Sequence, residues 1–148
     1  MKRLHVMLKV EDLEASIRFY SALFAAEPTK RKPDYAKWML EDPRVNFSIA
    51  PAPGEAGIEH LGIQAETPEE LAELRERIGR AGGTVDDEGE TTCCYARSDK
   101  TWVVDGQGVS WEAFHTFANA DSSHGESSPA EATCCAADCC SPAAAAGV

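Results

Sequence analysis

Residues 3–10 read RLHVMLKV, and residues 58–65 read IEHLGIQA. In both segments apolar residues alternate with other residues, which is the period-two pattern of a β-strand with one buried face. His5 and His60 lie near the start of each segment, on the face opposite to the apolar set. The pattern therefore predicts two equivalent strands, each presenting a histidine on the face that the apolar residues leave free.

A helix is predicted after each of these strands. In the first copy Asp12 is the cap residue, and the apolar stripe that follows comprises Leu13, Ile17, Tyr20 and Phe24. In the second copy Thr67, Pro68 and Glu70 supply an N-cap, a first-turn proline and a capping-box carboxylate. Gly82 ends this helix after an apolar face made by Leu71, Leu74 and Ile78. Both copies thus begin with a strand and a helix.

Shorter strand-like segments complete each copy. The first copy has them at residues 35–40 and 45–50, and the second at residues 84–85, 101–104 and 109–114. The final strands also correspond, because residues 45–49 match residues 109–113 and place Ser48 opposite Glu112. A repeat of this length implies paired modules that close one sheet. We therefore predict an α+β fold of two tandem βαβββ modules, in which a curved mixed sheet carries helices on its convex face and a metal site on its concave face.

Composition separates a folded domain from a tail. Residues 1–117 have an ordinary globular mixture and form the predicted domain, with modules at residues 3–52 and 57–117. Residues 118–148 consist almost entirely of alanine, serine, cysteine, glycine and acidic residues, so we predict a disordered tail. The tail cysteines lack zinc-finger spacing and form either a thiol-rich arm for a metalloid or a dispensable segment; they are Cys134, Cys135, Cys139 and Cys140.

The formal net charge is −11, which argues against nucleic acids and anionic membranes as partners. The first residues enter an alternating strand without the apolar core of a signal peptide, and no apolar run approaches the ~20 residues that span a bilayer. We therefore expect a cytoplasmic protein whose six cysteines are reduced rather than joined in a disulfide framework. A homodimer is compatible with the sequence.

Glu112 completes a candidate metal site with the two strand histidines. It lies on the inner face of its strand if Trp111 and Ala113 pack outward. A lone histidine or glutamate in a strand is more often structural, but equivalent positions in a repeat favour a shared role. Two imidazoles and one carboxylate are typical of non-haem Fe(II) sites that leave positions open for oxygen and substrate. Zinc also accepts such ligands, so the residue types alone leave the metal open.

Cys93 and Cys94 form a candidate chelating pair. Adjacent residues of a regular strand point to opposite faces, so both thiols reach one atom only where the chain leaves strand geometry. The acidic run at residues 86–90 favours a mobile loop at this place. Two thiolates would hold trivalent arsenic, a soft acceptor, by exchange for its hydroxyl groups. Two ordinary thiols, or a vicinal disulfide, are the alternatives at this point.

Three further segments carry a resemblance to a known family. They read TTCCYA at residues 91–96, SDKTWV at residues 98–103 and WEAFH at residues 111–115. Together they resemble the carbon–arsenic lyases and cadmium-induced proteins of the vicinal oxygen chelate superfamily. The resemblance covers roughly residues 3–117, and its most specific part is the CCYA-x-SDK-x-WV motif.

This resemblance implies a function. The family's pattern implies an Fe(II)-dependent dioxygenase that uses O2 to cleave the carbon–arsenic bond of trivalent methyl- or arylarsenicals, giving arsenite. It implies that Fe(II) is bound by His5, His60 and Glu112, and that the arsenical is held by Cys93 and Cys94. The segments around these ligands also offer three candidates for supporting contacts, namely Tyr95, Lys100 and Gln64.

Two other functions compete with this one. A glyoxalase-like metalloenzyme or a thiol transferase on the same fold commonly uses a further ligand from the first module, where Ser48 stands here. A thiol-based cadmium- or arsenite-binding resistance protein would need no catalysis and would explain the six cysteines. It would not explain why two histidines and a glutamate occupy matched inner positions.

Overall fold

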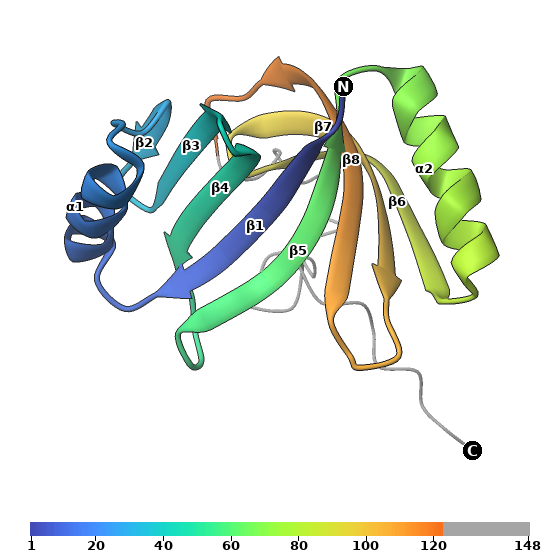
Figure 1. Ribbon diagram of the computed structural model, residues 1–148, viewed down its shortest axis with the longest axis horizontal. Helices are drawn as coiled ribbons and strands as arrows, with labels where there is room; N and C mark the ends of the chain where they lie inside the picture. Colours follow the sequence, from blue (N-terminus) through green and yellow to red (C-terminus); the bar gives the residue numbers. More distant parts are fainter. Residues whose placement is uncertain (123–148) are drawn as a thin grey trace, which may run out of the picture.

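The computed structural model describes residues 1–122, which form two βαβββ modules (Figure 1). The first module comprises β1 (Arg3–Val10), α1 (Leu13–Phe24), β2 (Lys30–Lys32), β3 (Tyr35–Glu41) and β4 (Arg44–Pro51). The second module comprises β5 (Gly57–Ala65), α2 (Pro68–Ala81), β6 (Thr84–Cys93), β7 (Ala96–Val104) and β8 (Ser110–Asn119). The α+β fold and the duplication expected from the sequence are confirmed.

The ends of some elements differ from the predictions. The sequence does not predict β2, and β8 runs to Asn119, beyond the predicted domain end at residue 117. Ala118 and Asn119 extend the ladder because they pair with the start of β7. The predicted tail from residue 123 onward lies outside the described residues, and so do Cys134, Cys135, Cys139 and Cys140.

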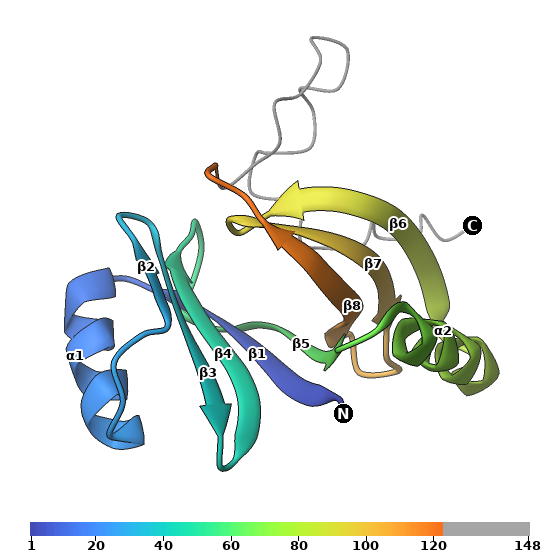
Figure 2. The ribbon, with the colours of Figure 1, turned by 90° about the horizontal axis from the view of Figure 1, so that it is seen from above.

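All eight strands belong to one sheet, in the order β2-β3-β4-β1-β5-β8-β7-β6. The modules meet where β1 pairs antiparallel with β5, while β1 with β4 and β5 with β8 are parallel pairs. Figure 2 shows that the sheet curves strongly and that both helices lie outside the curve. The edge strands β2 and β6 therefore rise on opposite sides of one concave face.

Both helices begin as their sequences predict, and α2 also ends as predicted. Asp12 Oδ1 accepts a hydrogen bond from Ala15 N at 2.9 Å, and Thr67 Oγ1 accepts one from Glu70 N at 3.2 Å. Gly82 ends α2 in the left-handed region at φ 77°. No helix among residues 1–122 is long and apolar enough to cross a membrane.

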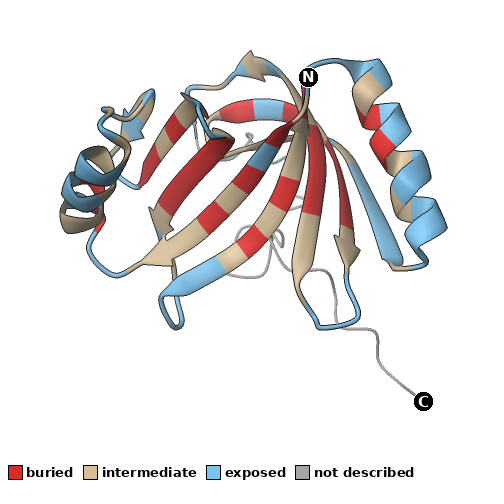
Figure 3. Cartoon of the chain, viewed as in Figure 1, coloured by how far each residue is buried: buried red, intermediate tan, exposed pale blue. Residues whose placement is uncertain are grey.

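The two modules have separate cores on the convex side. The first core is the larger and includes Leu13, Ile17, Ala36, Trp38, Val45, Phe47 and Ile49. The second comprises Ala65, Leu71, Leu74 and Ala113. Figure 3 shows buried positions along the central strands as well as under the helices. Because the helices cover only the convex side, the buried polar residues of the central strands face the concave side.

The acidic run at residues 86–90 is not the mobile loop that the sequence suggested. It belongs to β6, which pairs with β7 through a bulge. Asp87 Oδ1 accepts a hydrogen bond from Arg75 at 2.9 Å, and Glu88 Oε2 accepts one from the Trp102 indole at 2.8 Å. These donors lie in α2 and β7. Contacts with other elements therefore hold this acidic segment in a strand.

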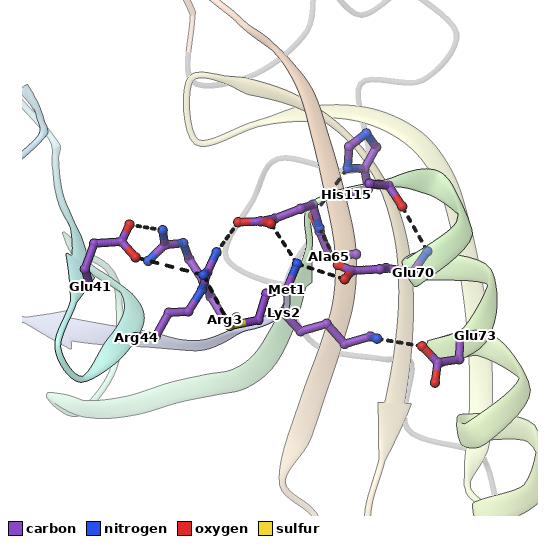
Figure 4. Close-up of polar contacts among 11 residues, drawn as sticks. Met1, Lys2, Arg3, Glu41, Arg44, Ala65, Glu70, Glu73 and His115 are labelled. Carbon is purple, nitrogen blue, oxygen red and sulfur yellow. Dashed lines mark hydrogen bonds and ion pairs between the residues drawn. The ribbon is translucent and has the colours of Figure 1, made fainter.

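Ion pairs link the modules at one end of the sheet (Figure 4). The Met1 amino group lies 2.7 Å from Glu66 Oε2 and 2.9 Å from Glu70 Oε1. Arg44 of β4 also pairs with Glu66. Because these groups are exposed or half-buried, each pair adds little stability. They align the start of β1 with the start of α2.

Candidate metal centre

Three neighbouring strands bring the predicted ligands together. His5 of β1 pairs in register with Gly62 of β5, and Gly62 pairs with Glu112 of β8. His60 lies two residues before Gly62 on the same face, so all three side chains project from adjacent strands into the concave side. Each is buried, with 4–6% of its surface exposed. The strand parity inferred from the repeat therefore brings all three residues together.

Gly62 is required by the close approach of β5 and β8. A Cβ atom at this position would lie 2.5 Å from the backbone oxygen of Glu112. Any other residue would therefore push β8 away from β5. The glycine thus sets the position of the Glu112 carboxylate relative to the two histidines.

The donor atoms of the three residues have a spacing that suits one cation. His5 Nε2 lies 3.2 Å from His60 Nε2. Glu112 Oε2 lies 3.7 Å from His5 Nε2 and 3.6 Å from His60 Nε2. Ligands bound at about 2.1 Å to one ion are separated by roughly 3.0–3.5 Å, depending on coordination number. The triad therefore could hold a divalent cation after very small movements.

A hydrogen bond at Nδ1 orients the imidazole of His5. Its Nδ1 lies 3.0 Å from the carbonyl oxygen of Asn46, to which an Nδ1–H group donates a hydrogen bond. This fixes the tautomer that leaves Nε2 free as a ligand. His60 Nδ1 lies 3.5 Å from the Glu59 carboxylate, close enough for an ion pair when the ring is protonated, although no hydrogen bond joins them. Both rings thus present Nε2 toward the centre.

The charges of the site set the protonation states of the three candidate ligands. Lys100 Nζ lies 2.6 Å from Glu112 Oε1. Burial alone would raise the pKa of Glu112, but Lys100 and the histidines hold it well below its usual range. Burial lowers the pKa of His5 to about 4. Burial also acts to lower the pKa of His60, but Glu112 and Glu59 outweigh it and raise this pKa to about 9. A metal ion would therefore replace a proton on His60.

The thiol pair lies in a tight turn between β6 and β7. Cys94 and Tyr95 have φ angles of 56° and 60°, the left-handed conformation of a two-residue hairpin turn. The chain therefore leaves strand geometry, as chelation requires. Cys93 Sγ and Cys94 Sγ are 3.2 Å apart and are not joined in a disulfide, which would need about 2.05 Å. Their hydrogen bond, together with burial, raises the pKa of Cys94 well above its usual value.

One cavity of about 40 Å³ contains the triad and the thiols. Sequence reasoning missed one of its walls, which includes Tyr35 and Lys37 from β3. Tyr35 and Ser48 hydroxyls form a 2.8 Å hydrogen bond. Among the described residues that line the cavity, Glu112 is the only carboxylate. The alternation of β3, with Tyr35 and Lys37 on the same face, was the signal that could have revealed this wall.

The supporting candidates occupy different places. Lys100 lines the cavity and carries the ion pair described above. Gln64 does not line it; its Oε1 accepts a hydrogen bond from Asn46 Nδ2 at 2.9 Å. Tyr95 does not line the cavity either, and its hydroxyl donates to Asp34 Oδ1 at 2.5 Å. Only one of the three candidates therefore touches the candidate ligands.

Comparisons with known proteins identify the family of this chain. The family model of the "Glyoxalase/Bleomycin resistance protein/Dioxygenase superfamily" matches residues 2–113. A trivalent organoarsenical cleaving enzyme of Bacillus sp. (strain MD1) is 48% identical over 119 residues, which cover 78% of this chain and 74% of the relative. The cadmium-induced protein CadI of Mycobacterium tuberculosis is 37% identical over 139 residues, covering 90% and 91% of the two chains.

Solved structures show the same fold at low sequence identity. An extradiol ring-cleaving dioxygenase from B. fuscum superposes with a TM-score of 0.60 at 17% identity, over 80% of this chain and 34% of the dioxygenase. A Mn(II)-bound glyoxalase from Novosphingobium aromaticivorans gives a TM-score of 0.55 at 19% identity, over 82% and 43% of the two chains. The chain belongs to the glyoxalase/bleomycin resistance protein/dioxygenase superfamily, in the family that contains the trivalent organoarsenical cleaving enzymes and the cadmium-induced proteins.

Proposed function

We propose that this protein is an Fe(II)-dependent dioxygenase that cleaves the carbon–arsenic bond of trivalent methyl- or arylarsenicals and releases arsenite. One observation carries the proposal: a histidine–histidine–glutamate triad and a pair of adjacent thiols that no disulfide joins line the same cavity. The relatives named trivalent organoarsenical cleaving enzymes support the substrate class. The use of oxygen and the identity of the metal are the parts that need a test.

The thiol pair captures the arsenical in this proposal. Cys93 and Cys94 exchange with the two hydroxyl groups of an organoarsonous acid. Two sulfur–arsenic bonds form, two arsenic–oxygen bonds break, and each thiol proton leaves with a hydroxyl group as water. A sulfur–sulfur distance of 3.2 Å suits two ligands of one soft atom. The organic group remains on arsenic, inside the cavity that the triad also lines.

His5, His60 and Glu112 would hold the metal. When bound, Fe(II) supplies open coordination positions for oxygen and the electrons that activate it. Lys100 keeps the Glu112 carboxylate ionised, and the Asn46 carbonyl keeps His5 in its ligating tautomer. The small buried cavity limits the access of water to the carbon–arsenic bond.

The test follows two products in one reaction. Protein loaded anaerobically with Fe(II) receives methylarsonous acid and then oxygen, and arsenite release and oxygen uptake are recorded together. We expect arsenite release and oxygen uptake with Fe(II), and neither of them with Zn(II) in the same site. Replacing both turn cysteines by serine should abolish capture and turnover. Arsenite release without oxygen uptake would contradict the dioxygenase assignment.

A metalloid-binding protein without catalysis is the second candidate, because the thiol pair can bind arsenic without a metal. The His60→Ala variant separates the two functions. It should lose turnover and keep arsenical retention if the protein is an enzyme. A glyoxalase-like reaction is less well supported, because Ser48 bonds to Tyr35 and the described cavity residues provide no second carboxylate.

A further inference from the structure

Two segments from opposite edges of the sheet meet above the cavity. β2 and β6 are the first and last strands of the sheet order. The hairpin of β2 and β3 belongs to the first module, and the turn with the thiols joins β6 to β7 in the second. Figure 2 shows the curve of the sheet that brings these two sides to face each other. Their contacts are made by side chains, since no backbone ladder joins them.

Tyr95 is the centre of these contacts. Its hydroxyl donates a hydrogen bond to Asp34 Oδ1 at 2.5 Å. Lys30 Nζ donates to the Tyr95 carbonyl oxygen and to Asn119 Oδ1, both at 2.8 Å. Lys32 Nζ lies 4.9 Å from the centre of the Tyr95 ring, within the range of a cation–π contact. Side chains of the first module thus hold Tyr95, the residue that directly follows Cys94, in place.

The backbone of the turn needs such support. Cys94 and Tyr95 are consecutive non-glycine residues with positive φ, a conformation that side chains disfavour and that persists where surrounding contacts hold it. The same backbone conformation brings the two sulfur atoms to 3.2 Å. Contacts that fix Tyr95 therefore also fix the distance between the thiols and their direction toward the triad.

We propose that Asp34, Lys30 and Tyr95 form a clasp that positions the thiol pair over the triad and controls access to it. The three are positioning residues, since they act through the turn. A cavity of about 40 Å³ holds only a few water molecules, so an organoarsenical reaches the sulfur atoms after the clasp opens. This inference deepens the proposed function and rests on it for its biological meaning, but the state of the clasp can be measured without any metal.

Thiol alkylation reports on the clasp directly. Metal-free full-length protein is treated with iodoacetamide, and the modification rate is followed on tryptic peptides. Residues 81–97 carry Cys93 and Cys94, whereas residues 101–148 carry the other four cysteines and serve as an internal reference. Tyr95→Phe removes only the hydroxyl donor, and Asp34→Ala removes its acceptor. Tyr20→Phe, in the first core, is the matched control.

Each clasp variant should raise the alkylation rate of the turn thiols about fivefold relative to the reference peptide, the effect expected from losing one ordinary hydrogen bond. The control should leave the ratio unchanged. Capture of phenylarsonous acid by the metal-free variants should become faster, and its release should also accelerate. Ratios equal to wild type in both clasp variants would overturn the proposal. Faster alkylation in clasp variants of a protein that consumes no oxygen would support the clasp and contradict the proposed dioxygenase function. Failure of the clasp proposal and failure of the proposed function are therefore distinguishable.

Discussion

Replacing Gly62 by alanine should disable the metal centre although no candidate ligand is replaced. The added Cβ would lie 2.5 Å from the Glu112 backbone oxygen, whereas ordinary contacts of this kind begin near 3.4 Å. The strands β5 and β8 must therefore separate by about 0.9 Å, the difference between these distances, which moves the carboxylate away from the histidines. A displacement of about 1 Å can cost about 100-fold in catalysis, and overpacking costs about 1–3 kcal/mol of stability.

The assay combines metal titration with thermal unfolding. We expect Gly62→Ala to bind Fe(II) or Co(II) at least tenfold more weakly, which corresponds to about 1.4 kcal/mol. Gly79→Ala is the matched control, because no atom lies within 4 Å of its added Cβ and α2 should gain up to about 1 kcal/mol of helix propensity. Unchanged metal affinity and unfolding in Gly62→Ala would refute the claim that the close β5–β8 contact sets the geometry of the triad.

Three further predictions concern the charges of the site. Lys100→Met should lower stability by about 3–5 kcal/mol in chemical unfolding, because it leaves the buried Glu112 carboxylate without its cation; Lys100→Arg should recover part of this loss. Metal affinity should rise about tenfold per pH unit up to roughly pH 9 and then level off in calorimetric titrations, because the His60 proton must leave before an ion binds. Ser48→Glu should suppress oxygen uptake, because it offers the ion a fourth protein ligand, and should destabilise the fold, because it buries a second carboxylate without a cation. Adding Tyr35→Lys should restore stability but not oxygen uptake. Equal oxygen uptake in Ser48→Glu and Ser48→Ala would contradict this prediction.

The parts of the fold that local patterns encode could be predicted from the sequence. Alternation along residues 3–10 and 58–65 gives strand parity, and parity together with the repeat was sufficient to bring His5, His60 and Glu112 to one face. The helix caps are equally local, since Asp12 bonds to a residue three positions away.

These local patterns could not predict contacts between residues that are distant in the sequence. The acidic run in β6 suggested a loop because its partners, Arg75 and Trp102, lie on other elements. Tyr95 gave no sign of its bond to Asp34, which is 61 residues away in sequence. The turn conformation of Cys94 was equally hidden, because a cysteine–tyrosine pair lacks the asparagine–glycine signal of this hairpin type. Side-chain contacts between different elements decide all three features.

The repeat also explains why the site has one carboxylate rather than two. Ser48 pairs in register with Lys37 and Glu112 with Trp102, so Tyr35 and Lys100, each two residues earlier, occupy equivalent positions. The second module therefore carries a buried ion pair, at 2.6 Å, where the first carries a neutral hydroxyl pair, at 2.8 Å.

A second buried carboxylate would need a second cation, because an uncompensated charge in the interior is costly. The neutral pair avoids this requirement and withholds a fourth protein ligand from the ion. A divalent cation held by two neutral imidazoles and one carboxylate keeps coordination positions for small molecules. In this chain the free side of the triad faces the cavity that Cys93 and Cys94 line. In the proposed function, the neutral pair in one module thus leaves room, on a nearly symmetric scaffold, for oxygen and a thiol-bound arsenical to meet.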